Sequence, residues 1–499
     1  MNPTVILIGL VSYFLVLLLI GFITGRKANE DSYFLGNKQS IWWMVALGML
    51  SDSMSGVSFI SVPGAVYNDQ FNYLQVVMGY VLGYLVIAYF LLPLYYKANV
   101  TSIYEYLEQR FGGVSQKTGA FFFVISRLLG AGGRLFLTAL VFQQFLFQPL
   151  GMPFEVTVAV IILLILTYTV KGGIRTLVFT DALQSVFLIG GLVVCIVSMV
   201  RSPELSQINA LEIFTMKSDF TSIFNWDVNS NKYFWKHLIG GMFITIAMTG
   251  LDQNMMQKNL SCKSLSDAQK NMLVTAVVVF FVNVLFLSLG VFMIEFLKNS
   301  GGIIVDPLTG KPSTDLFFPT IALQKLGLFA GLAFVLGLSA ATFSSADSVL
   351  TTLTTSTYVD IFSVPKRNWN IQLKHKYRVV LHLTYSVLLY LCILGFHKYS
   401  DGAVINVVLG LANYTYGPLL GLFALGMFTQ VKPSNMAVIV VSIVVPTICW
   451  YFGKNVFISE LLGWKPLNWK YQFGFELLLL NGLGSFIGYY VWAKFKPAN

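Results

Sequence analysis

The chain has 499 residues, of which 56% are hydrophobic and only 11% are charged. A soluble domain carries roughly 25% charged residues, so this composition excludes a protein built of water-soluble domains. Apolar runs of about 20 residues recur along the whole chain, as expected of a polytopic membrane protein. The net charge of +10 is spread over short loops between these runs. It therefore indicates membrane topology, and we expect no nucleic-acid partner.

Thirteen windows are long and apolar enough to cross about 30 Å of hydrocarbon. The first carries no basic residue before it and no small-residue cleavage site after it, so we interpret it as a retained helix and not as a signal peptide. An odd number of spans places the two termini on opposite sides of the membrane. The windows cover residues 4–24, 41–65, 72–95, 118–146, 155–170, 177–200, 233–257, 270–297, 327–359, 377–397, 402–427, 434–453 and 472–494.

The loops between the windows predict the orientation. With the N-terminus outside, the cytoplasmic segments, among them 258–270, carry 19 Lys and Arg residues, and the external segments carry 11. Short cytoplasmic loops are enriched in these residues, so we predict a cell-membrane protein with an external N-terminus and a cytoplasmic C-terminus. We expect a short cytoplasmic helix at 101–111, with its N-cap at Thr101 or Ser102. The external stretches 201–232 and 298–317 are expected to act as lids, the first with a short surface helix.

Two of the windows contain polar interruptions. The window 41–65 holds the run Ser51-Asp52-Ser53-Met54-Ser55-Gly56, and the window 233–257 holds Gly240-Gly241 and then Thr249-Gly250 before Asp252. Ser and Gly in a membrane helix also permit tight helix crossings, but a crossing does not explain Asp52. Backbone groups freed at a break must face protein or water. Two broken helices, five spans apart, are the pattern of an inverted-repeat transporter with its site at the breaks.

A third element is a stripe of hydroxyl side chains in the window 327–359. Its residues recur at intervals of three and four, which places them on one helix face; they are Ser344, Asp347, Ser348, Thr351 and Thr355. Such a stripe often only joins helices, but a carboxylate at membrane depth must be paired or bind a cation. Adjacent serines and carbonyls from a broken helix supply the oxygens that a small monovalent cation needs.

Two arginines lie seven residues apart in the fourth window. Each of Asp52, Asp181 and Asp252 can be explained simply as an ion-pair partner of Arg127 or Arg134. Arg134 lies too deep in its span to reach the interface easily. It therefore either pairs with an acid or binds an anionic substrate group, for which a guanidinium is well suited.

Several fragments, in this order and spacing, resemble the sodium:solute symporter family. This family contains bacterial proline, galactose and sialic acid transporters and the animal sodium-glucose cotransporters. The fragments are the serine-rich break ending in Pro63-Gly64-Ala65, the block 101–111, Gly172-Gly173 with Thr180-Asp181 and Gln184, Asp252-Gln253 with Gln257, Ser344-Ser345 with Asp360-Ile361, and Tyr416-Gly417-Pro418 with Gly421.

The resemblance implies an all-α membrane fold with the five-plus-five inverted repeat of the leucine-transporter group and added terminal helices. On this basis we divide the chain into five parts. They are an extra N-terminal helix and loop (1–40), a first five-helix repeat (41–200), an external loop (201–232), a second repeat (233–427) and two C-terminal helices (428–499).

The resemblance also implies two sodium sites. The family's main site falls here on Ser51, Met54, Ala341, Ser344 and Ser345. A second site known in some members falls on Asp181, Ser344, Asp347 and Ser348. At position 347 the family usually has a hydroxyl, so the carboxylate either strengthens this second site or turns it toward a proton or an internal ion pair.

For the substrate, Arg134 lies where the sialic acid branch has an arginine that meets the substrate carboxylate. Ser53, Ser55 and Ser58 match hydroxyl positions of that branch. Its glutamine on the next helix falls on Val77, and the nearest replacements are Asn72 and Gln75. Asp252 and Gln253, after the second break, complete the set of substrate residues that we predict.

The sequence therefore predicts a secondary active symporter that couples sodium to a small polar solute by alternating access, with a sugar, sialic acid or other sugar acid favoured. The alternatives are coupling to protons, an amino-acid or carboxylate substrate, and a passive channel or receptor. We expect no enzyme, because no nucleophile and base pair, metal cluster or phosphate loop is present in the sequence. We expect no cofactor apart from Na⁺, and partners limited to the solute, sodium and the lipid bilayer, with a monomer as the functional unit.

Overall fold

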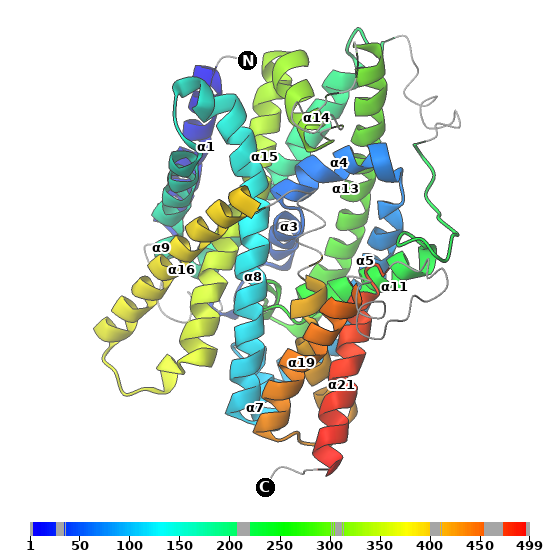
Figure 1. The fold of residues 1–499 in the computed structure, drawn as a ribbon. Coiled ribbons are helices and arrows are strands. Elements are labelled where there is room, and N and C mark those ends of the chain that lie inside the picture. The colour runs from blue at the N-terminus through cyan, green and yellow to red at the C-terminus, as the bar shows by residue number, and fades with distance from the viewer. Residues whose placement is uncertain are drawn as a thin grey trace.

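The computed structural model describes the chain except residues 1–2, 26–33, 35, 207–219, 301, 303, 305–311, 313, 400–409, 411, 454–472 and 496–499. The described residues form a bundle of helices, and no β-strand occurs among them (Figure 1). Helix α1 (Pro3–Gly25) begins at one end of the bundle, and α21 (Leu477–Phe495) ends at the opposite end. This arrangement agrees with termini on opposite sides of a membrane.

The predicted spans coincide with helices. Seven helices are long and apolar enough to cross a membrane, and nine are if each of two bent pairs counts as one span, within the part of the chain that the structure describes. The seven are α1, α5 (Tyr73–Val86) with α6 (Leu92–Ala98), α8 (Gly113–Phe142), the second part of α9 (Phe154–Val200), α13 (Leu265–Asn299), α15 (Gly327–Ser356) and α16 (Ile371–Tyr399). The shorter helices α18 (Gly417–Phe428) and α19 (Asn435–Gly453) and the helix α21 follow in the C-terminal part.

The two predicted breaks are confirmed. Helices α3 (Trp42–Ser53) and α4 (Gly56–Asp69) meet at an angle of 58°, and α4 lies across the bundle (Figure 1). Helix α11 (Phe234–Thr245) continues as a π-turn and is bent by 63° relative to α12 (Gln253–Leu260). In both cases the break lies beside a run of polar residues. The backbone groups freed at such a break must be satisfied by protein or water, because lipid offers them no hydrogen bonds.

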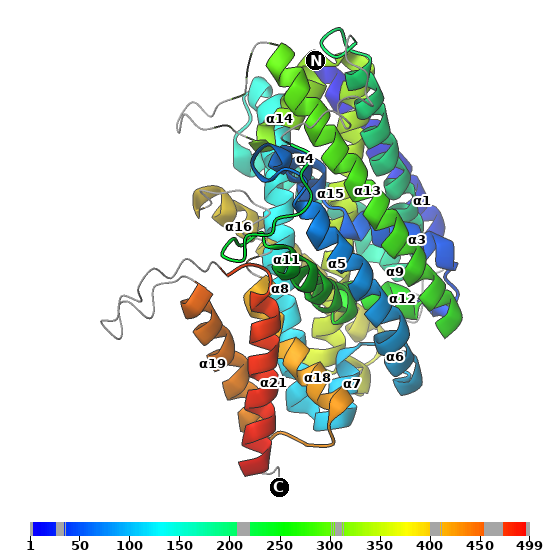
Figure 2. The ribbon, with the colours of Figure 1, turned by 90° about the vertical axis from the view of Figure 1, so that its right-hand side faces the viewer.

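The Gly240-Gly241 pair does not interrupt its helix, contrary to our prediction. α11 is continuous through both residues and packs closely on α5 (Figure 2). A Cβ atom on Gly241 would lie only 2.2 Å from the carbonyl oxygen of Val76. These glycines therefore allow two backbones to approach, which is the role that we had weighed for the Ser and Gly positions of the first break.

Two further predictions concern helices α9 and α7. The windows 155–170 and 177–200 are confirmed as two helical segments of α9, because the backbone leaves the helical conformation at Gly173 (φ 57°, ψ −166°), a conformation that glycine adopts readily. The cytoplasmic helix α7 (Tyr104–Phe111) begins after Ile103, and the Ser102 hydroxyl accepts from the Tyr104 N–H (3.2 Å), while Glu105 accepts from the N–H groups of Thr101 and Ser102. The capping role predicted for Ser102 is therefore supported. The surface helix expected in 201–232 and the first part of the window 402–427 fall largely outside the described residues.

Helix α15 lies in the middle of the bundle. Every residue from Gly337 to Ser356 is buried, and the helix packs against α9, α8, α3 and α16. The predicted hydroxyl stripe therefore faces protein and not lipid. Because α3 packs against α15, the break of the first helix and the polar stripe of α15 meet inside the bundle.

Candidate functional site

The break between α3 and α4 leaves backbone carbonyl oxygens without the hydrogen bonds of a continuous helix. The last bond of α3 runs from the Met54 N–H to the Leu50 carbonyl (2.8 Å), and the first of α4 runs from the Phe59 N–H to the Ser55 carbonyl (3.0 Å). The carbonyls from Ser51 to Met54 belong to the unsatisfied end of α3, where the helix dipole also favours a positive charge. They are acceptors for a cation at the centre of the protein.

Of the paired serines of α15, Ser344 contacts the end of α3 at this break. The hydroxyl of Ser344 donates to Asp52 Oδ1 (3.4 Å), and the hydroxyl of Ser345 donates to the Thr342 carbonyl (2.9 Å). Both side chains are buried, as is Ala341 one turn earlier. The structure thus brings the residues predicted for the main sodium site onto two adjoining elements. Their role as sodium ligands stays a prediction.

A lysine that we had assigned to a cytoplasmic loop occupies the position next to these serines. Lys258 lies on α12 with no exposed side-chain surface, and its ammonium donates to Asp52 Oδ2 (2.6 Å), Asp181 Oδ2 (2.5 Å) and Ser348 Oγ (2.9 Å). Asp181 and Ser348 are two residues of the predicted second sodium site. Asp347 is also buried, but its carboxylate is not among the oxygens around this ammonium.

Asp252 has a structural environment that differs from the substrate role predicted for it. Its Oδ1 caps α12 by accepting from the N–H groups of Asn254 and Met255. Its Oδ2 accepts from Arg127 Nε (2.5 Å) and from the Tyr416 hydroxyl (2.7 Å). The carboxylate is fully buried and fully bonded, so the simple ion-pair explanation holds for Asp252.

Gln253 is likewise placed away from the central cavity. Its side-chain oxygen accepts from the Ile103 N–H (2.9 Å), and its amide donates to the Thr101 carbonyl (3.3 Å). These bonds join the start of α12 to the segment before α7. We therefore no longer assign Asp252 and Gln253 to the substrate.

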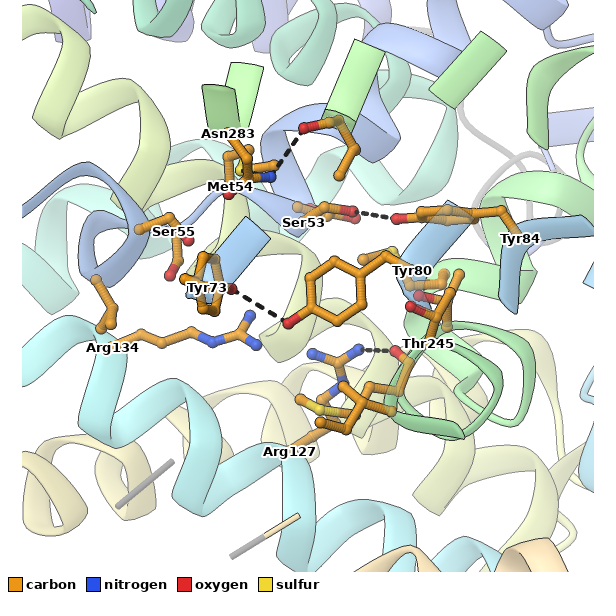
Figure 3. Close-up of a pocket in the computed structure, with 18 residues that line it drawn as sticks. Ser53, Met54, Ser55, Tyr73, Tyr80, Tyr84, Arg127, Arg134, Thr245 and Asn283 are labelled. Carbon is orange, nitrogen blue, oxygen red and sulfur yellow. Dashed lines mark hydrogen bonds between the residues drawn. The ribbon is translucent and has the colours of Figure 1, made fainter. Parts of the chain in front are cut away.

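A cavity of about 100 Å³ lies beside the break, enclosed by α3, α4, α5, α8, α11 and α13 (Figure 3). Of the predicted substrate residues, four line it: Ser53, Ser55, Ser58 and Arg134. Figure 3 shows Arg134 and Arg127 extending from α8 toward the tyrosines of α5. The full lining comprises Asp52, Ser53, Met54, Ser55, Val57, Ser58, Tyr73, Tyr80, Tyr84, Arg127, Arg134, Ile244, Thr245, Met248, Thr249, Met255, Val279 and Asn283.

Asn72 and Gln75, the other predicted substrate residues, do not line this cavity. The Gln75 amide donates to the Lys232 carbonyl (3.2 Å), and its oxygen accepts from the Asn225 N–H (3.3 Å). Asn72 bonds within its own turn, to the Asp69 carbonyl (2.6 Å). Gln75 therefore holds the segment that precedes α11 against the start of α5.

Sequence reasoning missed the tyrosines of α5. Tyr73, Tyr80 and Tyr84 follow one another at intervals of seven and four residues, which is the spacing of one helix face and was a usable signal. The hydroxyls of Tyr73 and Tyr80 lie 3.2 Å apart, and Tyr84 lies 3.3 Å from Ser53 Oγ. The cavity therefore presents aromatic faces and phenolic hydroxyls opposite two guanidinium groups (Figure 3).

The chain was compared with known proteins. Residues 33–442 match the family model described as the sodium:solute symporter family. The chain is 24% identical to the human sodium/iodide cotransporter over 82% of its own length and 63% of the relative's, so it spans somewhat less than two thirds of that protein. It is 23% identical to the sodium/sialic acid symporter SiaT of Proteus mirabilis, over 88% of this chain and 87% of the relative.

Solved structures give the same fold. A substrate-bound, outward-open Na⁺-coupled sialic acid symporter aligns over 98% of both chains with a TM-score of 0.82 and 20% identity. This likeness confirms the predicted leucine-transporter-like arrangement of helices.

Proposed function

We propose that this chain, which belongs to the sodium:solute symporter family, is a sodium-coupled transporter that works by alternating access, and that its solute is a small hydroxylated carboxylate, such as a sugar acid. The family and its relatives are transporters, so the chemistry to be explained is recognition of the ion and of the solute.

The proposed solute rests on a difference between the two arginines of α8: one is paired with a carboxylate, and the other is not. The guanidinium of Arg127 is neutralised by Asp252 at 2.5 Å. Arg134 lines the same cavity, yet within the described part of the chain it forms no ion pair and no hydrogen bond. Arg134 is half-buried. A guanidinium at membrane depth without a counter-ion is costly, and its planar fork matches a carboxylate. We assign it to the anionic group of the solute.

The other lining residues support a solute with hydroxyl groups. Ser53, Ser55 and Ser58 approach from the broken helix, and Tyr73 and Tyr80 approach from α5. Hydroxyls both donate and accept, so they suit polyhydroxylated partners, while tyrosine rings suit the apolar face of a sugar. The named relatives carry anions, iodide in one case and sialic acid in the other, which is consistent with a cationic cavity.

For sodium we propose the main site as predicted, with carbonyls of Ser51, Met54 and Ala341 and hydroxyls of Ser344 and Ser345. Its neighbour Asp52 also lines the solute cavity, so ion and solute adjoin the same break. Ligands that stabilise one arrangement of a shared element raise each other's affinity reciprocally. This proximity gives a physical basis for coupling.

We also propose that the N-terminus is external, that the C-terminus is cytoplasmic, that the chain functions as a monomer and that its two five-helix repeats are residues 41–200 and 233–427. The predicted cytoplasmic loops hold more Lys and Arg residues than the external loops, which supports this orientation. The excess remains when Lys258 is no longer counted as a loop residue.

The proposed solute class is tested by the thermal stability of the purified protein. Sugar acids, neutral sugars, amino acids and short monocarboxylates are added in sodium chloride and, separately, in choline chloride. We expect stabilisation by hydroxylated carboxylates, larger in sodium. Stabilisation by neutral sugars and none by their acids would contradict the role of Arg134. A stabilising effect that is equal in both salts would contradict the coupling.

A further inference from the structure

Lys258 has the contacts of a bound cation. A lysine ammonium has three N–H donors, and here each donor has an oxygen acceptor, two from carboxylates and one from a hydroxyl. The side chain has no exposed surface. A buried ammonium is tolerated only when its charge and its donors are matched, so these contacts define a site and not an accidental approach.

The three oxygens come from three different helices. Asp52 lies at the C-terminal end of α3, Asp181 on α9 and Ser348 on α15, while the lysine itself lies on α12 after the second break. One ammonium therefore joins both broken helices to two helices that are not broken there. A carboxylate on α9 and a hydroxyl on α15 are also the kinds of ligand that a sodium ion would take at this position.

The charges around the ammonium leave room for one further cation. Asp52 and Asp181 together carry two negative charges and Lys258 supplies one positive charge. Oδ2 of Asp52 is bound to the lysine, whereas Oδ1 faces Ser344 of the proposed sodium site. One sodium ion at that site would balance the charges of these three bonded residues. The buried carboxylate of Asp347 lies outside this group and is not part of the count. A second ion beside Lys258 would meet a like charge, and two of the oxygens nearest to it, Asp181 Oδ2 and Ser348 Oγ, already bind the ammonium.

We propose that the ammonium of Lys258 is a built-in cation that takes the place of a second cotransported sodium, so that one sodium ion binds per protein in each transport cycle. This inference rests on the sodium coupling described above but not on the identity of the solute. Its structural signature is the set of three contacts from Lys258 to Asp52, Asp181 and Ser348.

The test is equilibrium binding of radioactive sodium to the purified full-length protein, with choline chloride holding the ionic strength constant. We expect one sodium per wild-type chain. In Lys258→Met the two carboxylates lose their cation, and we expect the ratio to rise to two. Lys258→Arg keeps the charge and should keep a ratio of one. Lys263→Met is the matched control, because Lys263 is an exposed lysine five residues further along the chain, and it should also keep a ratio of one.

Each outcome separates the inference from the function on which it rests. Two sodium ions on the wild-type chain would overturn the inference and leave sodium coupling intact, whereas no bound sodium would overturn the proposed sodium coupling itself. A ratio of one in Lys258→Met, with unchanged sodium affinity, would reduce the lysine to a structural role. If that variant does not fold, a ratio of two in the wild type or in Lys258→Arg would still overturn the inference.

Discussion

Two arginines on one helix provide a sharp test of the site, because one is paired and the other is not. We compare Arg134→Met with Arg127→Met. Both changes replace a guanidinium with an apolar side chain in α8, and both residues line the cavity. If the cavity were only a packing defect, the two variants would behave alike. If Arg134 holds the solute, Arg134→Met should lose solute affinity without losing stability, whereas Arg127→Met should lose stability.

The structure sets the magnitudes. Arg127→Met leaves Asp252 fully buried without its cation, and breaking such a pair costs about 3–5 kcal/mol. The lower end applies, since the Tyr416 hydroxyl and two backbone N–H groups still donate to Asp252. Arg134→Met removes an unpaired, half-buried charge, so stability should be unchanged or raised. A lost charge-assisted hydrogen bond of about 1.5–3 kcal/mol corresponds to a loss of solute affinity of roughly 10- to 150-fold.

The assay measures thermal stability without solute and solute affinity in saturating sodium, for both variants and the wild type. We expect Arg134→Met to melt at or above the wild-type temperature and to bind the solute at least about tenfold more weakly. Arg127→Met should melt clearly lower. Normal solute affinity in a well-folded Arg134→Met protein would refute the assignment of the carboxylate to this arginine.

Three further outcomes follow from the structure. Replacing sodium by choline in the uptake medium should reduce solute uptake into proteoliposomes to background, and uptake that persists would exclude sodium coupling. The double change Ser344→Ala with Ser345→Ala should weaken apparent sodium affinity at least about tenfold in sodium titrations of uptake, while Ser339→Ala, also buried on α15, should leave it unchanged. Gly241→Ala should destabilise the protein by about 1–3 kcal/mol in thermal unfolding, because its Cβ would collide with a carbonyl of α5. Gly190→Ala, which meets nothing within 4 Å, should change stability by no more than about 0.5 kcal/mol, and equal effects of the two would show that this packing is not tight.

Much of the site was predictable because its residues violate the apolar pattern of their spans. Asp52 in a serine run and Ser344-Ser345 in a membrane helix are costly in lipid, so their positions alone indicated a central polar site. Arg134 was identified for the same reason. The tyrosines of α5 were missed since tyrosine is common in membrane helices, and only their shared face distinguishes them.

The amino-acid sequence by itself determined the membrane class, the spans, the two broken helices and the polar residues that must be satisfied inside the protein, because hydrocarbon tolerates few exceptions to apolar composition. Only the tertiary structure decided which charged side chains form ion pairs with one another. Lys258 has the sequence context of a cytoplasmic loop, yet α12 turns back into the bundle after the second break and carries its ammonium to Asp52 and Asp181. Arg127 pairs with Asp252 and Arg134 does not, although both lie on the same helix. Charge pairing depends on distances of a few ångströms between residues far apart in the chain, and those distances are set by the packing of helices.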